Sequence, residues 1–167
     1  VPMQGLASLP VFFDLAGKRG LLAGGSARAA WKAELLQAAG ARVDVVCAAP
    51  GAELVALAES CPAVRLVLRH WLPEDFNGAT LAIGDFQAKP EAAAFHAAAR
   101  LARIPVNLID RPECCDFQIG TIIDRSPLVI AISTKGASPI FALALRGWLE
   151  ALLPQALKFW AAAAESW

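Results

Sequence analysis

A glycine turn between two apolar segments constrains this chain more than any other feature. Residues 20–23 are typical of a short buried strand, and the turn Gly24-Gly25-Ser26 follows at once. An Ala-rich run then continues to Ala39, and residues 43–47 are typical of a second strand. Strand, glycine turn, helix and strand in this order open a dinucleotide-binding α/β fold. The sequence therefore predicts a Rossmann-like parallel sheet with a nicotinamide dinucleotide at its first turn.

One position of this glycine fingerprint is unusual. In the register G-x-G-x-x-G/A, Gly24 fills the first position and Ala29 the third, but Ser26 replaces the second glycine. The second glycine lets the backbone approach the pyrophosphate closely. We expect the Ser26 side chain to point into the space of the phosphate oxygens and to weaken binding without abolishing it. Arg28 opposes the helix dipole in the first helical turn, so it is either a solvated surface residue or a contact for a bound anion.

Strands alternate with helices over the first two thirds of the chain. We expect strands at 21–23, 43–47, 64–68, 81–83 and 106–109, and helices at 27–39, 52–60 and 90–103. This alternation predicts a parallel sheet that helices cover on both faces. Ligands of such sheets bind beyond the carboxyl ends of the strands. Residues 9–13 could add an edge strand or an arm.

The pattern changes after residue 117. Two β-rich runs, 117–123 and 128–133, flank a turn at 124–127, and Ser138 then caps a helix that ends near Leu153. A hairpin and one helix bury little surface alone, so we expect a second copy of the chain to cover them. The predicted domains are a Rossmann-like NAD-binding domain (1–117), a dimerisation hairpin and helix (118–153), and the start of a C-terminal helical region (154–167).

Composition argues against several classes of protein. The chain has 15 basic and 15 acidic residues and no basic stripe with aromatics, which argues against nucleic-acid binding. No apolar run reaches the ~18 residues of a membrane span. The cysteines form no C-x-x-C pair, and the two histidines are not spaced to join them, so we expect no bound structural metal and free thiols in a reducing cytoplasm. These cysteines are Cys47, Cys61, Cys114 and Cys115.

Three longer segments carry a resemblance to a known family. They are LPVFFDLAGKRGLLAGGSARAAWKAELLQAAGARVDVV, PVNLIDRPECCDF and TIIDRSPLVIAISTKGASPIFALALRGWLEALLP. Together they resemble the siroheme synthase N-terminal module, the precorrin-2 dehydrogenase and sirohydrochlorin ferrochelatase family. The most specific part is Ile122–Leu128, followed by Ser138-Pro139. The resemblance implies a Rossmann-like domain followed by an interlocked dimerisation hairpin and helix, in a homodimer.

The resemblance also implies an activity in siroheme biosynthesis. Members of the family oxidise precorrin-2 to sirohydrochlorin with NAD⁺, and many then insert Fe²⁺ to give siroheme. One aspartate is credited in both steps and matches Asp110, whose carboxylate would accept protons. A cap for the turn before Arg111-Pro112 is the alternative role. Because no acidic residue ends the second strand, NAD rather than NADP follows from the resemblance alone. The family's cofactor contacts carry over to Gly24, Gly25, Ser26, Ala27, Arg28, Ala48 and Ala49.

The loop before the last predicted helix also matches the family. Hydroxyl groups of Ser133 and Thr134, backbone N–H groups and the Lys135 ammonium could receive the carboxylates of a tetrapyrrole substrate. A helix-entry loop with ordinary capping is an equal alternative.

Four positions depart from the family pattern. They are Ser26, Trp31, the pair Asp85-Phe86, and Leu143. Asp85 would place negative charge near a negatively charged ligand, and Phe86 would add bulk. A chelatase or tetrapyrrole-binding protein that has lost the dinucleotide is therefore a second hypothesis. A generic nucleotide-sensing α/β domain is a third, but it leaves the segment Ile122–Leu128 unexplained.

Overall fold

The computed structural model describes residues 5–136 and 138–164, which divide into two compact units. Residues 11–117 form the first unit. The second contains residues 5–10, 118–136 and 138–164.

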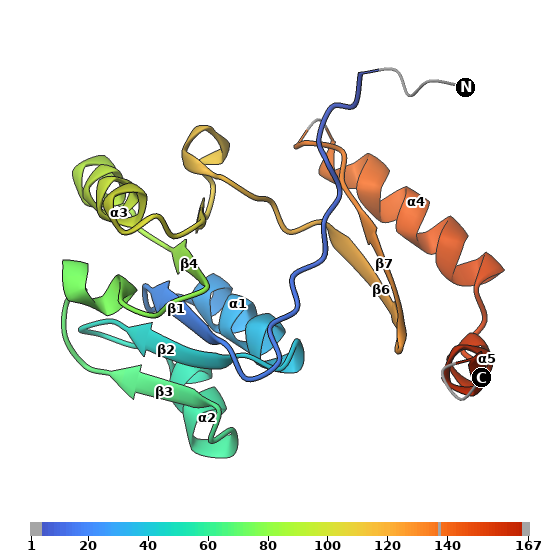
Figure 1. Cartoon of the computed structure of the whole chain (residues 1–167), viewed down its shortest axis with the longest axis horizontal. Coiled ribbons are helices and arrows are strands. Elements are labelled where there is room, and N and C mark those ends of the chain that lie inside the picture. The colour runs from blue at the N-terminus through green and yellow to red at the C-terminus, as the bar shows by residue number, and fades with distance from the viewer. Residues whose placement is uncertain (1–4, 137, 165–167) are drawn as a thin grey trace. The chain divides into compact units, whose positions relative to one another are not determined.

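The first unit is built on a five-stranded parallel sheet with the order β3-β2-β1-β4-β5 (Figure 1). Strands β1, β4 and β5 consist almost entirely of buried residues, as expected of strands covered on both faces, whereas β3 buries only Val64. Strand order reverses between β1 and β4, and ligands of open α/β sheets bind at such a switch point. The strands are β1 (Arg19–Ala23), β2 (Arg42–Val46), β3 (Val64–Val67), β4 (Leu81–Gly84) and β5 (Val106–Leu108).

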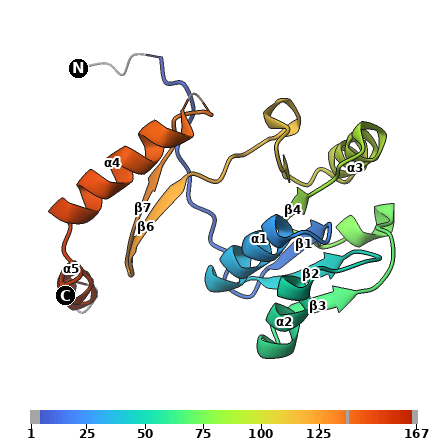
Figure 2. The ribbon, with the colours of Figure 1, turned by 180° about the vertical axis from the view of Figure 1, so that it is seen from behind.

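Three helices cover this sheet. Helices α1 and α2 pack beside each other on one face (Figure 2). Helix α3 packs on β4 and β5 together with the short 3₁₀ helix η1. In α1 the buried residues Ala29, Ala33 and Leu36 recur at helical spacing and form its core-facing stripe. The helical segments are α1 (Ala27–Ala38), α2 (Ala52–Ser60), α3 (Lys89–Ala102), η1 (Pro73–Phe76) and a second 3₁₀ helix, η2 (Pro112–Cys114).

An aromatic cluster fills the core between α3 and the sheet. The ring of Phe95 is fully buried, and its centroid lies 4.8 Å from that of Phe76 and 5.1 Å from those of Trp71 and Phe86. Tilted and edge-to-face pairs at these distances add to the stabilisation from burial. Phe86, expected to be an obstruction at the ligand edge, is therefore also a packing residue.

The second unit contains an antiparallel hairpin of β6 (Thr121–Arg125) and β7 (Leu128–Ile132), helix α4 (Pro139–Leu152) and helix α5 (Leu157–Ala164). Arg125 pairs with Leu128, so the loop is only Ser126-Pro127 and the turn lies one residue beyond its predicted place. The expected fold class, a Rossmann-like α/β sheet followed by a hairpin and helix, is confirmed. Residues 165–167 of the predicted C-terminal region lie outside the described residues.

Two polar side chains organise this second unit. Ser138 caps α4, as expected, because its hydroxyl oxygen accepts a hydrogen bond from the N–H of Phe141 at 3.1 Å. The buried guanidinium of Arg125 donates to the carbonyl of Leu153 at 3.0 Å and to that of Asp124 at 2.8 Å. Arg125 thus ties the hairpin to the end of α4.

Residues 9–13 form no strand, which corrects one of the two sequence expectations for this segment. Pro10 has no N–H to donate to a neighbouring strand, and the side chains of Leu9 and Phe12 are exposed. The ring of Phe13 instead packs 5.7 Å from that of Phe117. The segment is an irregular arm.

Among the described residues, no single helix is long and apolar enough to cross a membrane. Residues 140–152 and 157–164 reach that length and apolar composition only together, and a 70° bend separates them.

Candidate functional site

The glycine turn after β1 packs against two neighbouring loops of its own unit. Gly24 has φ +134°, and a Cβ there would lie 2.7 Å from the carbonyl oxygen of Asp85. A Cβ on Gly25 would lie 2.3 Å from the carbonyl oxygen of Ala49. The N–H of Gly51 donates to the carbonyl of Gly25 at 2.7 Å. Both glycines are therefore required by close packing of the turn onto the loops after β4 and β2.

A cavity of about 350 Å³ opens beside this turn, at the carboxyl ends of the strands. Its volume lies in the range of small-molecule sites, roughly 300–1,000 Å³. Four of the predicted cofactor residues line it together: Gly24, Gly25, Ala48 and Ala49. Its remaining lining includes His70, Trp71, Asp85, Phe86 and Glu91. The described residues that line it include two carboxylates but no lysine or arginine.

Three of these lining residues were missed from the sequence. His70 and Trp71 follow β3 by three and four residues, so they lie near the carboxyl end of a strand. Glu91 belongs to the first turn of α3, just after the loop that leaves β4. All three residues follow the carboxyl end of a parallel strand in the sequence, and this is the signal that could have identified them as lining residues.

Ser26 has a different role from the one expected at the second fingerprint position. It is the N-cap of α1, and its hydroxyl oxygen accepts from the N–H groups of Arg28 at 3.1 Å and Ala29 at 3.3 Å. The same hydroxyl donates to the carboxylate of Asp85. The expectation that it points at phosphate oxygens is thus corrected, because the side chain turns back onto its own helix.

Replacing Ser26 with Ala should lower the free energy of unfolding by about 1 kcal/mol, the usual cost of losing a serine N-cap. Urea titrations of the native protein and the variant measure this difference. Ser60→Ala is the control, since that exposed hydroxyl bonds only carbonyls of its own helix. Equal stability of the native and Ser26→Ala proteins would contradict the capping role.

Arg28 links two carboxylates that are far apart in the sequence. One guanidinium nitrogen, Nη1, bonds the carboxylate of Asp110, and the other, Nη2, lies 3.5 Å from Oδ1 of Asp85. The Asp85 side chain is only 5% exposed, whereas that of Asp110 is 71% exposed. Arg28 is therefore not simply a solvated surface residue. Ser26, Asp85, Arg28 and Asp110 form one connected polar network.

Asp110 lies two residues beyond β5 with φ +59°, in the left-handed region. The N–H of Ile109 donates to the carbonyl of Gly84 at 2.9 Å and holds the chain against β4. The Cys115 thiol accepts from the N–H of Leu108 at 3.2 Å, and burial raises its pKa. Cys115, as a protonated thiol, thus stabilises the chain that leaves β5. The side chain of Asp110 on this segment remains accessible to solvent.

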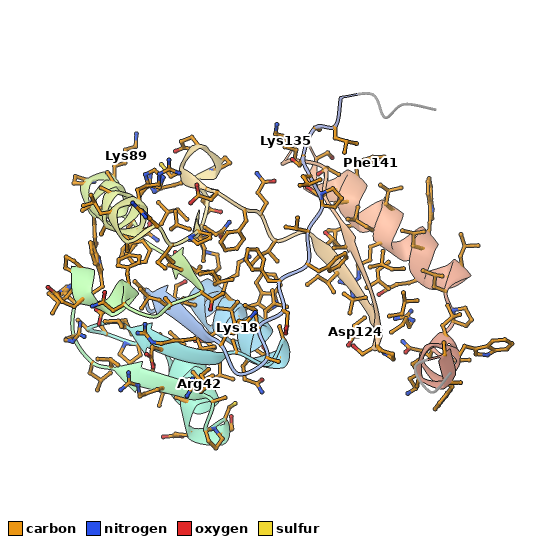
Figure 3. The ribbon with its side chains drawn as sticks, viewed as in Figure 1. Lys18, Arg42, Lys89, Asp124, Lys135 and Phe141 are labelled. Carbon is orange, nitrogen blue, oxygen red and sulfur yellow. The ribbon has the colours of Figure 1, made fainter. Side chains whose placement is uncertain are left out.

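The loop after β7 contains the predicted substrate residues. Ser133 and Thr134 line a second cavity, of about 180 Å³, which belongs to the hairpin unit. Lys135 is exposed and is not among the residues that line it; Figure 3 shows it at the opposite end of this unit from Asp124. The Ser133 hydroxyl accepts from the N–H of Lys135 at 3.2 Å, which is a local turn contact. The loop therefore combines ordinary turn bonds with a small hydroxyl-lined cavity.

The described residues hold no cluster of three or more His, Cys, Asp or Glu side chains that could bind a metal ion. All four cysteines are free thiols.

Comparison with known proteins agrees with this geometry. The chain is 38% identical over 147 residues to a protein named siroheme synthase from Nitrosomonas eutropha, and 40% identical over 148 residues to one from Nitrosomonas europaea. These alignments cover 88% and 89% of this chain but only 31% of each relative, so the chain spans about a third of their length. They confirm the resemblance to siroheme synthases that the sequence motifs carry.

A solved structure described as SirC, precorrin-2 dehydrogenase, superimposes with a TM-score of 0.71 over 90% of this chain and 74% of that one. Its sequence identity is 22%, so the likeness supports the fold. A family model described as "Putative NAD(P)-binding" matches residues 11–121, which include the whole five-stranded sheet. The chain therefore belongs to this NAD(P)-binding family.

Proposed function

We propose that this chain acts in siroheme biosynthesis as an NAD-dependent dehydrogenase that oxidises precorrin-2 to sirohydrochlorin. The observation that carries the proposal is the cavity at the switch point of the sheet, lined by the glycine turn and flanked by the network that ends at Asp110. Relatives named siroheme synthase and the SirC-like fold supply the substrate class.

The residues at this edge fit a dinucleotide. The turn at Gly24-Gly25 has no side chains, and the N-terminus of α1 with the Arg28 cation suits a pyrophosphate. Trp71 and Phe86 provide flat apolar surface in the cavity for a base. We assign the pyrophosphate to residues 24–28 and the adenosine side to Ala48 and Ala49. The Asp85 carboxylate opposes an anionic ligand here, so we expect affinity below that of an all-glycine fingerprint.

Oxidation of precorrin-2 removes a hydride and a proton from the substrate. The dinucleotide that residues 24–28 would hold would supply the hydride acceptor. The carboxylate of Asp110 accepts the proton, because it is the exposed base of the network at this edge of the sheet. Ser133, Thr134 and Lys135 supply hydroxyl and ammonium donors for substrate carboxylates, with the N–H groups at the start of α4.

NAD⁺ should bind at least about tenfold more tightly than NADP⁺, a difference of ~1.4 kcal/mol. The extra phosphate of NADP⁺ would enter a cavity whose charged lining residues are Asp85 and Glu91. Calorimetric titration with each dinucleotide measures the ratio, and Glu91→Gln should reduce it. Equal affinities for the two dinucleotides in the native protein would refute this assignment.

Insertion of Fe²⁺ into sirohydrochlorin is a second proposed activity. Metallation strips two pyrrole N–H protons, and an accessible carboxylate such as that of Asp110 can accept them one after the other and release each to water. Iron enters this reaction as a substrate. The alternative is a chelatase that has lost NAD⁺ binding, and the buried carboxylate of Asp85 beside the glycine turn supports it.

Separate assays of the two steps test these proposals. In the first assay, native protein is mixed with precorrin-2, with and without NAD⁺, and the formation of sirohydrochlorin is followed by its absorption. In the second assay, native protein is mixed with sirohydrochlorin and Fe²⁺, and metallation is followed. NAD⁺-dependent oxidation supports the dehydrogenase. Metallation by a protein that cannot oxidise precorrin-2 would instead identify the chelatase.

We also propose a homodimer formed through the hairpin unit. Helix α4 exposes five large apolar side chains, each between 53% and 81% accessible: Ile140, Phe141, Leu143, Trp148 and Leu152. A helix that exposes this many large apolar side chains indicates an interaction surface, and a second copy is the partner that the symmetry of most soluble oligomers favours. Sedimentation at micromolar concentration should show a dimer that Leu143→Glu disrupts. A monomeric native protein would rule the proposal out.

We also propose that the protein resides in a reducing compartment, the cytoplasm. The four thiols are all unpaired, and vicinal Cys114 and Cys115 lie close to Asp110 in the sequence. Free thiols persist where glutathione and thioredoxin keep them reduced.

A further inference from the structure

The guanidinium of Arg28 is shared between a buried carboxylate and an exposed one. Asp85 is held in place by the Ser26 hydroxyl and by its own burial, whereas Asp110 is bound to Arg28 from an exposed turn. The Arg28 side chain is itself half exposed and starts in the first turn of α1. Of the two contacts, the one to Asp110 is therefore the easier to break.

We infer that Arg28 is a positioning residue that holds Asp110 while no dinucleotide is bound and exchanges it for the pyrophosphate when one binds. This inference rests on the proposed function. A guanidinium binds phosphate oxygens in a bidentate manner, and these charge-assisted bonds are stronger than an exposed ion pair with one carboxylate. The exchange leaves the oxygens of Asp110 free to accept a proton. Cofactor binding and the availability of the base are thereby coupled.

Competition for Arg28 has a consequence for affinity. If Asp110 must give up Arg28 before the pyrophosphate can take it, then neutralising Asp110 should tighten NAD⁺ binding. The exposure of the pair limits the gain to about two- to fivefold, the range of surface ion pairs. If Asp110 only supported the fold, or only accepted a proton later in the reaction, then neutralising it would leave the affinity for NAD⁺ unchanged or would reduce it.

A double-mutant cycle measured by calorimetric NAD⁺ titration tests the exchange. Asp110→Asn should tighten binding two- to fivefold, and Arg28→Met should weaken it about tenfold or more, as expected for loss of a charged phosphate contact. In the Arg28→Met background, Asp110→Asn should have no further effect, because the group for which Asp110 competes is gone. Such coupling is the signature that a purely structural role lacks.

Asp14→Asn is the matched control for overall charge. Asp14 is an exposed carboxylate paired with Lys18 at 4.0 Å, before β1, so this substitution should leave NAD⁺ affinity unchanged. If the native protein binds NAD⁺ but Asp110→Asn does not tighten binding, or tightens it equally without Arg28, the exchange is overturned and the dehydrogenase proposal stands. If the native protein binds no NAD⁺, both are overturned.

Discussion

Asp110→Asn is expected to slow precorrin-2 oxidation by roughly 10²–10⁴-fold, the usual contribution of a general base. Asn has the size of Asp and tolerates the left-handed backbone at φ +59°, but its amide cannot accept a proton at neutral pH. The side chain is 71% exposed and its ion pair with Arg28 lies at the surface, so stability should change by less than about 1 kcal/mol.

Single-turnover assays of oxidation and of metallation with this variant show which step uses the carboxylate. Asp14→Asn is again the control, since it removes the same charge from an exposed pair before β1. Native rates in both assays with Asp110→Asn would remove this residue from the mechanism.

Phe95→Ala is expected to lower the free energy of unfolding by about 3–5 kcal/mol, the range for deleting a large aromatic side chain from a core. Phe95 is fully buried and contacts the rings of Phe76, Trp71 and Phe86. Its removal leaves a cavity at the centre of the cluster that packs α3 on the sheet. Urea unfolding followed by circular dichroism measures the loss.

Phe12→Ala provides the matched comparison, because that ring lies exposed on the irregular arm. Its effect should stay within about 0.5 kcal/mol, as for most surface substitutions. A loss below 1 kcal/mol for Phe95→Ala would mean that the aromatic cluster does not support this unit. Because Trp71 and Phe86 also line the cavity, the variant should weaken NAD⁺ binding as well.

The sheet of the first unit could be predicted because its signals are local. Mostly apolar runs of three to five residues mark the strands, and Gly24 and Gly40 mark the ends of the first strand and helix. The hairpin turn was predicted one residue too early, since the pairing of Arg125 with Leu128 depends on the partner strand. Residues 9–13 have the composition of a strand but no ladder to join.

The candidate site was predictable only in part. Ala48 and Ala49 could be placed beside Gly24 because parallel strands bring their carboxyl ends to one edge. The contacts of Ser26 with Asp85 and of Arg28 with Asp110 span 59 and 82 residues, and no local pattern encodes them. The sequence indicated that Asp85 adds negative charge near the turn. Only the fold shows that Ser26 and Arg28 hold it there.

Calorimetric titration of NAD⁺ into the native protein, Gly24→Ala and Gly78→Ala tests the central claim most directly. Both glycines have positive φ, but a Cβ on Gly24 would collide with the backbone of Asp85, whereas one on Gly78 would meet open space. We predict one site per native chain with a dissociation constant of about 1 μM to 1 mM, the range typical of enzyme ligands. Affinity should fall at least tenfold in Gly24→Ala and stay near native in Gly78→Ala. A folded native protein that binds no NAD⁺, or equal affinities in all three proteins, would contradict a dinucleotide site at the glycine turn.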